Sequence, residues 1–94
     1  MKVKELLTDE SKWLQHRYAI NADGKDVNAC SNAAVKWCLV GAMIKCYPNC
    51  DTVYSLVLDK IKEKGTKYYT LSKWNDAFKR TFEDVKQVIA ELDI

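Results

Sequence analysis

The chain is poor in proline, glycine and histidine, and each shortage excludes a class of protein or a kind of functional site. One Pro and three Gly in 94 residues, with 48% apolar residues, exclude a collagen-like or disordered chain and predict one globular domain over residues 1–94. A single histidine, His16, leaves neither a two-histidine metal site nor a histidine-rich catalytic centre. Gly-rich phosphate loops and the HExxH and GxSxG segments are missing too. Enzymatic chemistry therefore has little support, and we expect no cofactor.

The sequence also lacks an excess of charge and a long apolar run. A net charge of +2, from 15 basic and 13 acidic residues, is too weak a field to indicate nucleic-acid binding by itself. The longest nearly apolar run, 37–44, is far shorter than the ~20 residues that cross a bilayer. The polar residues Thr8, Asp9 and Glu10 arrive before the apolar core of a signal peptide could form. We expect a cytoplasmic protein with no membrane partner.

Cysteine is the one metal-binding residue type that is present in number. Cys30, Cys38, Cys46 and Cys50 lie close together in the sequence, but only the last two approach the short spacing of a structural zinc knuckle. Disulfides are rare in a reducing cell. We therefore expect free thiols and no metal site. A Cys–His dyad of Cys38 or Cys30 with His16 is the remaining thiol-based alternative, although a lone histidine in a polar loop is usually solvated.

Apolar residues recur at helical spacing in four segments, which predicts a mainly α fold of about four helices. The first segment is a short helix with Val3, Leu6 and Leu7, and the second is a central buried helix near 32–46 capped by Ser31 or Asn32. The third is an amphipathic helix near 51–64 capped by Asp51 or Thr52. The fourth is a closing helix near 81–93 capped by Thr81. The Asp23-Gly24 turn signal predicts a short β-hairpin or ordered loop near 17–28. A further β-prone patch covers 67–70, and Gly65 is typical of a helix end.

Gly41 lies inside the predicted central helix. Glycine costs such a helix roughly 1 kcal/mol relative to alanine, and close approach of another backbone is a common reason for keeping it. Ala34, Cys38 and Ala42 fall on nearly the same face as Gly41. The sequence therefore predicts a tight contact along this face.

Three segments carry a resemblance. They are WLQHRYAINADG (13–24), AVKWCLVGA (34–42) and WNDAFKRT (74–81). They resemble, in the same order, patterns close to WTQGxYAxDAxG, AxCWCxxGA and WNDxPGRT in an uncharacterised family of small bacterial and phage proteins. The matching positions are Trp13, Gln15, Tyr18, Ala19, Asp23 and Gly24 in the first segment, Trp37, Cys38, Gly41 and Ala42 in the second, and Trp74, Asn75, Asp76, Arg80 and Thr81 in the third.

The chain departs from those patterns at several positions. His16 stands where the family tends to have Gly, Lys36 replaces the first Cys of CWC, and Phe78-Lys79 replaces Pro-Gly. The resemblance implies a bacterial cell or a phage-infected host as the setting, but no mechanism.

The segment WNDAFKRT allows two interpretations. In the first it joins two helices: Trp74 fills the core, Asn75 or Asp76 satisfies free backbone groups at a helix end, and Arg80 braces the joint. In the second it contributes to a pocket for a partner or small ligand. The candidate binding residues are Gln15, Tyr18, Trp74, Asn75, Asp76 and Arg80.

A local excess of aromatic and basic residues surrounds the same segment. Its members are Lys67, Tyr68, Tyr69, Lys73, Trp74, Phe78, Lys79 and Arg80. Such residues occur at protein-binding hot spots and can stack on nucleic acid, but they also commonly lie over a core.

These observations favour a small non-enzymatic accessory or inhibitor that binds a protein partner, including a phage product that acts against a host defence system. The first alternative is a small-ligand or nucleotide binder with its pocket at the WND/Arg motif. The second is a small enzyme that uses Asp76 or Cys38, and nucleic acid is the less supported class of partner.

Overall fold

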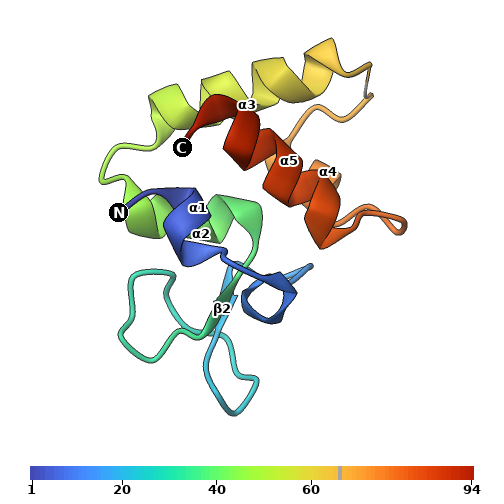
Figure 1. Ribbon diagram of the computed structural model, residues 1–94. Coiled ribbons are helices and arrows are strands. Elements are labelled where there is room, and N and C mark those ends of the chain that lie inside the picture. Colours follow the sequence, from blue (N-terminus) through green and yellow to red (C-terminus); the bar gives the residue numbers. More distant parts are fainter. Residues whose placement is uncertain (66) are drawn as a thin grey trace.

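The computed structural model describes residues 1–65 and 67–94 and confirms a mainly α domain (Figure 1). Within these residues the helices are α1 (Val3–Leu6), α2 (Leu39–Cys46), α3 (Asp51–Glu63), α4 (Leu71–Asn75) and α5 (Phe82–Leu92), with a short 3-10 helix η1 (Glu10–Lys12). The strands are β1 (Ala19–Ile20) and β2 (Lys36–Trp37). No helix in this part of the chain is long and apolar enough to cross a membrane.

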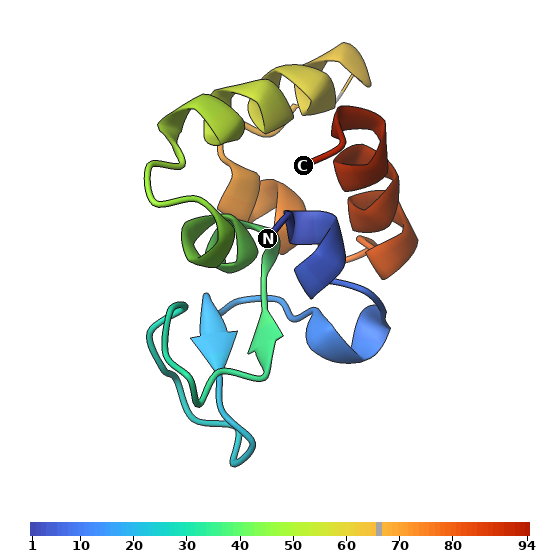
Figure 2. The same cartoon turned by 60° about the vertical axis from the view of Figure 1, so that its left-hand side comes forward.

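The helices gather in one half of the molecule, and the two strands with their loops form the other end (Figures 1 and 2). Helix α2 contacts α1, α3 and α4, while α3 packs against α5. Leu39 and Met43 of α2, Val57 and Ile61 of α3, and Ile89 of α5 are almost completely buried. The core therefore forms around α2, the segment with the densest apolar composition.

The strands form a two-stranded antiparallel hairpin in which Ala19 pairs with Trp37 and Ile20 with Lys36. A turn that contains Gly24, at φ 79°, follows β1, and Ile20 also bridges Asp26. The predicted turn near 17–28 is present. The second strand of the hairpin, however, lies further along the chain than that range.

The predicted start of the central helix is wrong, because α2 begins at Leu39 rather than near residue 32. Ser31 and Asn32 are not its cap. The Cys38 sulfur caps α2 instead, because it accepts a hydrogen bond from the Gly41 N–H at 3.3 Å. Lys36 and Trp37 instead pair with β1, and the Cys38 N–H donates to the Tyr18 carbonyl at 3.2 Å. A tertiary strand pairing thus replaces the first helical turns.

Three other expectations concern helix ends. Cys50, not Asp51 or Thr52, precedes α3, and its side chain makes no capping hydrogen bond. Gly65, at φ 82°, follows α3 in the left-handed conformation, as predicted. Thr81 caps α5 in a reciprocal capping box with Asp84, also as predicted.

Helix α4 is an element that the sequence did not predict. Residues 67–70 form no strand, and the Thr70 hydroxyl accepts a hydrogen bond from the Lys73 N–H at 3.2 Å to cap α4. The helix is only one turn long and buries Leu71, Trp74 and Asn75. Such a short apolar segment has no periodicity that would separate it from a strand.

Candidate functional site

Asn75 brings together the three segments that carry the resemblance. It is fully buried at the end of α4. Its Oδ1 accepts hydrogen bonds from the Leu39 N–H at 3.0 Å and from the Trp13 indole Nε1–H at 2.7 Å. Its Nδ2 donates to the Leu14 carbonyl at 3.1 Å and to Asp76 Oδ1 at 3.0 Å. Because these four bonds use the whole capacity of the amide, Asn75 holds the fold and is not free to bind a ligand.

Gln15 and Arg80 satisfy backbone carbonyls at the end of α4. Gln15 Nε2 donates to the carbonyls of Asn75 at 2.9 Å and Ala77 at 3.0 Å. Arg80 Nε donates to the Trp74 carbonyl at 2.8 Å, and its guanidinium lies 4.1 Å from the centre of the buried Trp74 ring. The last carbonyls of a helix have no partner within the helix, so these side chains replace that partner. The contacts agree with the helix-junction interpretation.

Asp76 differs from these residues because only one of its carboxylate oxygens is used. Oδ1 accepts hydrogen bonds from the His16 N–H at 2.8 Å and from Asn75 Nδ2. Oδ2 accepts no hydrogen bond from residues 1–65 or 67–94, and His16 Nδ1 lies 3.9 Å from it. His16 itself has a φ of 74°, which is unusual for a residue other than glycine.

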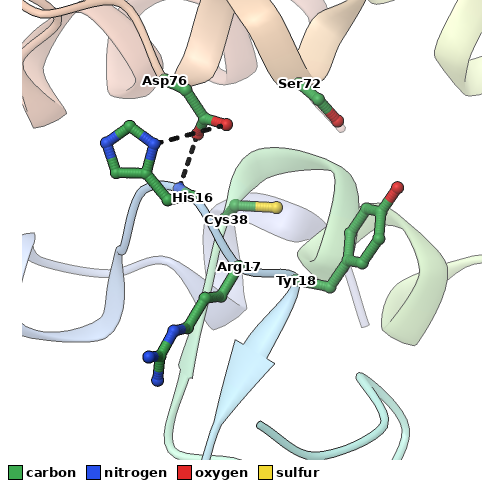
Figure 3. A pocket seen from close by; sticks show the side chains of 6 residues that line it. All are labelled: His16, Arg17, Tyr18, Cys38, Ser72 and Asp76. Carbon is green, nitrogen blue, oxygen red and sulfur yellow. Dashed lines mark hydrogen bonds and ion pairs between the residues drawn. The ribbon is translucent and has the colours of Figure 1, made fainter.

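A cavity of about 180 Å³ lies beside Asp76 (Figure 3). Its walls come from the segment before β1, from the start of α2 and from α4. The lining residues are His16, Arg17, Tyr18, Cys38, Ser72 and Asp76. Of the six candidate binding residues, Tyr18 and Asp76 line this cavity, whereas Gln15, Trp74, Asn75 and Arg80 do not.

The Cys38 side chain points into the cavity, but its chemistry is that of a neutral thiol (Figure 3). The residue is buried, and burial raises the pKa of the thiol, a direction to which the nearby Asp76 carboxylate adds. Backbone hydrogen bonds to the sulfur, including the one from Gly41, oppose the rise without cancelling it. A nucleophilic cysteine needs the opposite shift, so the geometry does not activate Cys38.

The comparisons with known proteins identify a family but no activity. Residues 1–92 match the model of DUF6197, described as a family of unknown function. The chain belongs to this family. No curated protein and no solved structure matches it. DUF6197 is an uncharacterised family, as the resemblance predicts, and membership in it assigns no role to any residue.

The four cysteines of this DUF6197 chain differ in exposure. All four are free in the described part of the chain: Cys38 is buried, Cys46 and Cys50 are half-buried, and Cys30 is exposed. Among residues 1–65 and 67–94, no group of three His, Cys, Asp or Glu side chains could hold a metal ion.

The aromatic and basic residues around α4 divide into two groups. Trp74 is buried, and Arg80 and Tyr68 are partly covered, with the guanidinium 5.7 Å from the centre of the Tyr68 ring. Phe78 and Tyr69, by contrast, are 97% and 84% exposed. The first group therefore lies over the core, whereas Phe78 and Tyr69 project into solvent.

Proposed function

We propose that this protein is a small non-enzymatic binding protein that recognises another protein through the loop at residues 76–81, between α4 and α5. The observation that carries the proposal is Phe78, whose side chain is 97% exposed on this loop. A phenyl ring in water contributes nothing to the core, yet it can bury a large apolar area against a partner. Aromatic side chains of this kind dominate binding energy in protein interfaces.

The loop that carries Phe78 is held in one conformation. The Arg80 N–H donates to the Ala77 carbonyl at 2.9 Å, and the same carbonyl accepts from Gln15 Nε2. Arg80 also bonds to the Trp74 carbonyl at the start of the loop. A loop that is already ordered loses little conformational entropy when it binds, so more of the contact energy appears as affinity.

The surroundings of Phe78 indicate the chemistry of the partner. Lys79 follows Phe78 and is exposed, and it lines a shallow hollow together with Tyr68, Ala77, Phe78 and Arg80. An apolar anchor with a basic rim is complementary to an apolar pocket with an acidic rim. The partner we propose is a protein that presents such a pocket.

The neutral Cys38 thiol also supports a binding role over an enzymatic one. In this proposal the protein acts as an accessory or inhibitor of its partner. The most specific version of the proposal is a phage-encoded inhibitor of a host defence system. The resemblance to bacterial and phage proteins makes a bacterial lysate the place to search for the partner.

The experiment compares the wild type with Phe78→Ser and with the matched control Leu56→Ser, which changes a 48% exposed residue on α3. Each immobilised protein is exposed to nuclease-treated bacterial lysate, and any partner captured is purified and titrated. We expect one acidic-surfaced protein to bind the wild type and Leu56→Ser alike. Its affinity for Phe78→Ser should fall by at least about 30-fold, or about 2 kcal/mol.

Phe78→Ser should leave the free energy of unfolding within about 0.5 kcal/mol of wild type, because the ring makes no core contact. Denaturant unfolding checks this. Equal capture by Phe78→Ser, or capture of nucleic acid from untreated lysate in place of a protein, would contradict the proposal.

A further inference from the structure

We infer that the cavity beside Asp76 is a binding site for a small primary ammonium group. The site is separate from the Phe78 contact and goes beyond the proposed function. It rests on one carboxylate, on the hydroxyl groups around it and on the size of the cavity (Figure 3).

The Asp76 carboxylate is fixed in position before any ligand arrives. The His16 N–H and Asn75 Nδ2 both bond to Oδ1, and Asn75 is itself anchored by three other hydrogen bonds. This leaves Oδ2 as the oxygen on the cavity side (Figure 3). A half-buried carboxylate oxygen that accepts no hydrogen bond from the described residues attracts a cation with N–H donors, because hydrogen bonds between charged groups are the strong ones.

The remaining polar atoms of the cavity suit the same ligand. The Ser72 and Tyr18 hydroxyls make no hydrogen bond with the described residues, and the Cys38 side chain points toward Tyr18 (Figure 3). An ammonium group has three N–H donors and no acceptor. One donor can bond to Asp76 Oδ2, and the others can bond to hydroxyl oxygens or water.

The basic residue that lines the cavity does not neutralise Asp76. Arg17 points away from it (Figure 3), since its Nη1 donates to the Gly24 carbonyl at 2.7 Å and its Nε lies 3.4 Å from the Asp26 carboxylate. The His16 imidazole is largely exposed and lies 3.9 Å from Oδ2. Arg17 is therefore engaged elsewhere and leaves the negative charge of Asp76 at the cavity, which favours a cation over an anion beside that carboxylate.

The size of the cavity limits the ligand. A volume of about 180 Å³ is smaller than the roughly 300–1,000 Å³ of pockets that hold drug-sized ligands, and it equals about six water molecules at ~30 Å³ each. The cavity is too small to enclose a nucleotide. A small amine or the end of a lysine side chain does.

The test is an NMR titration of ¹⁵N-labelled protein with ethylammonium chloride. Sodium acetate at equal ionic strength tests the sign of the charge that binds. Tetramethylammonium chloride, a cation without N–H donors, tests whether those donors are needed. We expect saturable shifts at Tyr18, Cys38, Ser72 and Asp76 with ethylammonium only. A short peptide with a free lysine, compared with its acetylated form, shows whether a lysine side chain also binds.

Asp76→Asn should weaken ethylammonium binding at least about tenfold, because the amide keeps an oxygen for the His16 N–H but removes the charge. The matched control Asp59→Asn removes one charge from the exposed side of α3 and should bind as wild type does.

Ser72→Leu, which fills the cavity and leaves Asp76 intact, should abolish the shifts. If Asp76→Asn does not fold, Ser72→Leu alone tests whether ethylammonium binds in the cavity. Equal shifts with acetate, no saturable shifts, or unchanged binding in a folded Asp76→Asn or Ser72→Leu protein would overturn the inference.

Discussion

At the scale of single residues, a buried amide at the end of α4, Asn75, makes four side-chain hydrogen bonds that join three separate segments. Asn75 satisfies the first N–H of α2, the Trp13 indole and the Leu14 carbonyl at once. No other polar residue in the described part of the chain is classed as buried. Its removal would leave two donors and one acceptor without partners inside the protein.

We predict that Asn75→Ala lowers the free energy of unfolding by about 3 kcal/mol or more, since each unsatisfied buried group costs about 1–3 kcal/mol. Urea denaturation followed by tryptophan fluorescence measures the change. The control is Asn49→Ala, because Asn49 is exposed and its side chain bonds, among the residues that the structure describes, only to the Asp51 N–H at 3.3 Å. That variant should lose less than about 1 kcal/mol. Equal losses in the two variants would contradict the role assigned to Asn75.

Part of the site could be predicted from the sequence. Trp74, Asn75 and Arg80 behave as the junction interpretation expects, because Asx residues and arginine commonly satisfy backbone groups at helix ends. Ser72 and Cys38 were not among the candidate binding residues. They meet Asp76 and Tyr18 only because α4 packs on α2 and because Tyr18 precedes β1, and no local pattern contains such contacts.

At the scale of elements, the start of α2 shows how a tertiary contact overrides a helical pattern. The apolar run before Leu39 fits a helix, but β1 offers Lys36 and Trp37 a pairing partner. Gly41 then lies against the backbone of Tyr18, as the sequence predicts for a glycine in this helix. A Cβ placed at Gly41 would be 2.0 Å from the Tyr18 carbonyl oxygen.

We predict that Gly41→Ala destabilises the protein by several kcal/mol, although alanine favours a helix by about 1 kcal/mol relative to glycine. The new methyl group can be accommodated only if Tyr18 moves away from α2, which breaks the bond from the Cys38 N–H. Thermal and urea unfolding measure the loss.

Gly24→Ala is the control for this substitution. It has open space around the new Cβ but a φ of 79°, so it should cost only about 1–2 kcal/mol. A Gly41→Ala protein as stable as wild type would show that α2 and the Tyr18 segment are not in close contact.

At the scale of the whole molecule, contacts between its two ends complete the helical core. Helix α1 packs on α5 and α2, the Lys4 N–H donates to the Ile94 carbonyl at 3.2 Å, and Ile94 is buried. The sequence predicts the helical class and the apolar faces. It does not predict which ends meet, because pairing of distant segments depends on the complete arrangement.

The ion pairs of Asp93 with Lys2 and Lys4 make a prediction about pH. Hydrogen bonds from Lys4 and then Lys2 lower the pKa of Asp93 to about 2, whereas an aspartate in an unfolded chain has a pKa near ~3.9. Because the folded value is the lower one, the contribution of Asp93 to stability is fully present above pH ~4. It is lost as the pH falls toward about 2.

We therefore predict that Asp93→Asn is less stable than wild type above pH ~4 and that the difference shrinks as the pH falls to about 2. Asparagine tolerates the left-handed backbone at this position, φ 55°, so the substitution removes the charge with little strain. Urea unfolding at several pH values measures the difference, and 1 M salt should reduce it because the pair is exposed. The control is Asp59→Asn, at an aspartate that makes no ion pair with the described residues; its stability difference from wild type should not shrink as the pH falls. If the stability difference between Asp93→Asn and wild type is constant from pH 5 to 2, the ion pairs do not stabilise the folded chain.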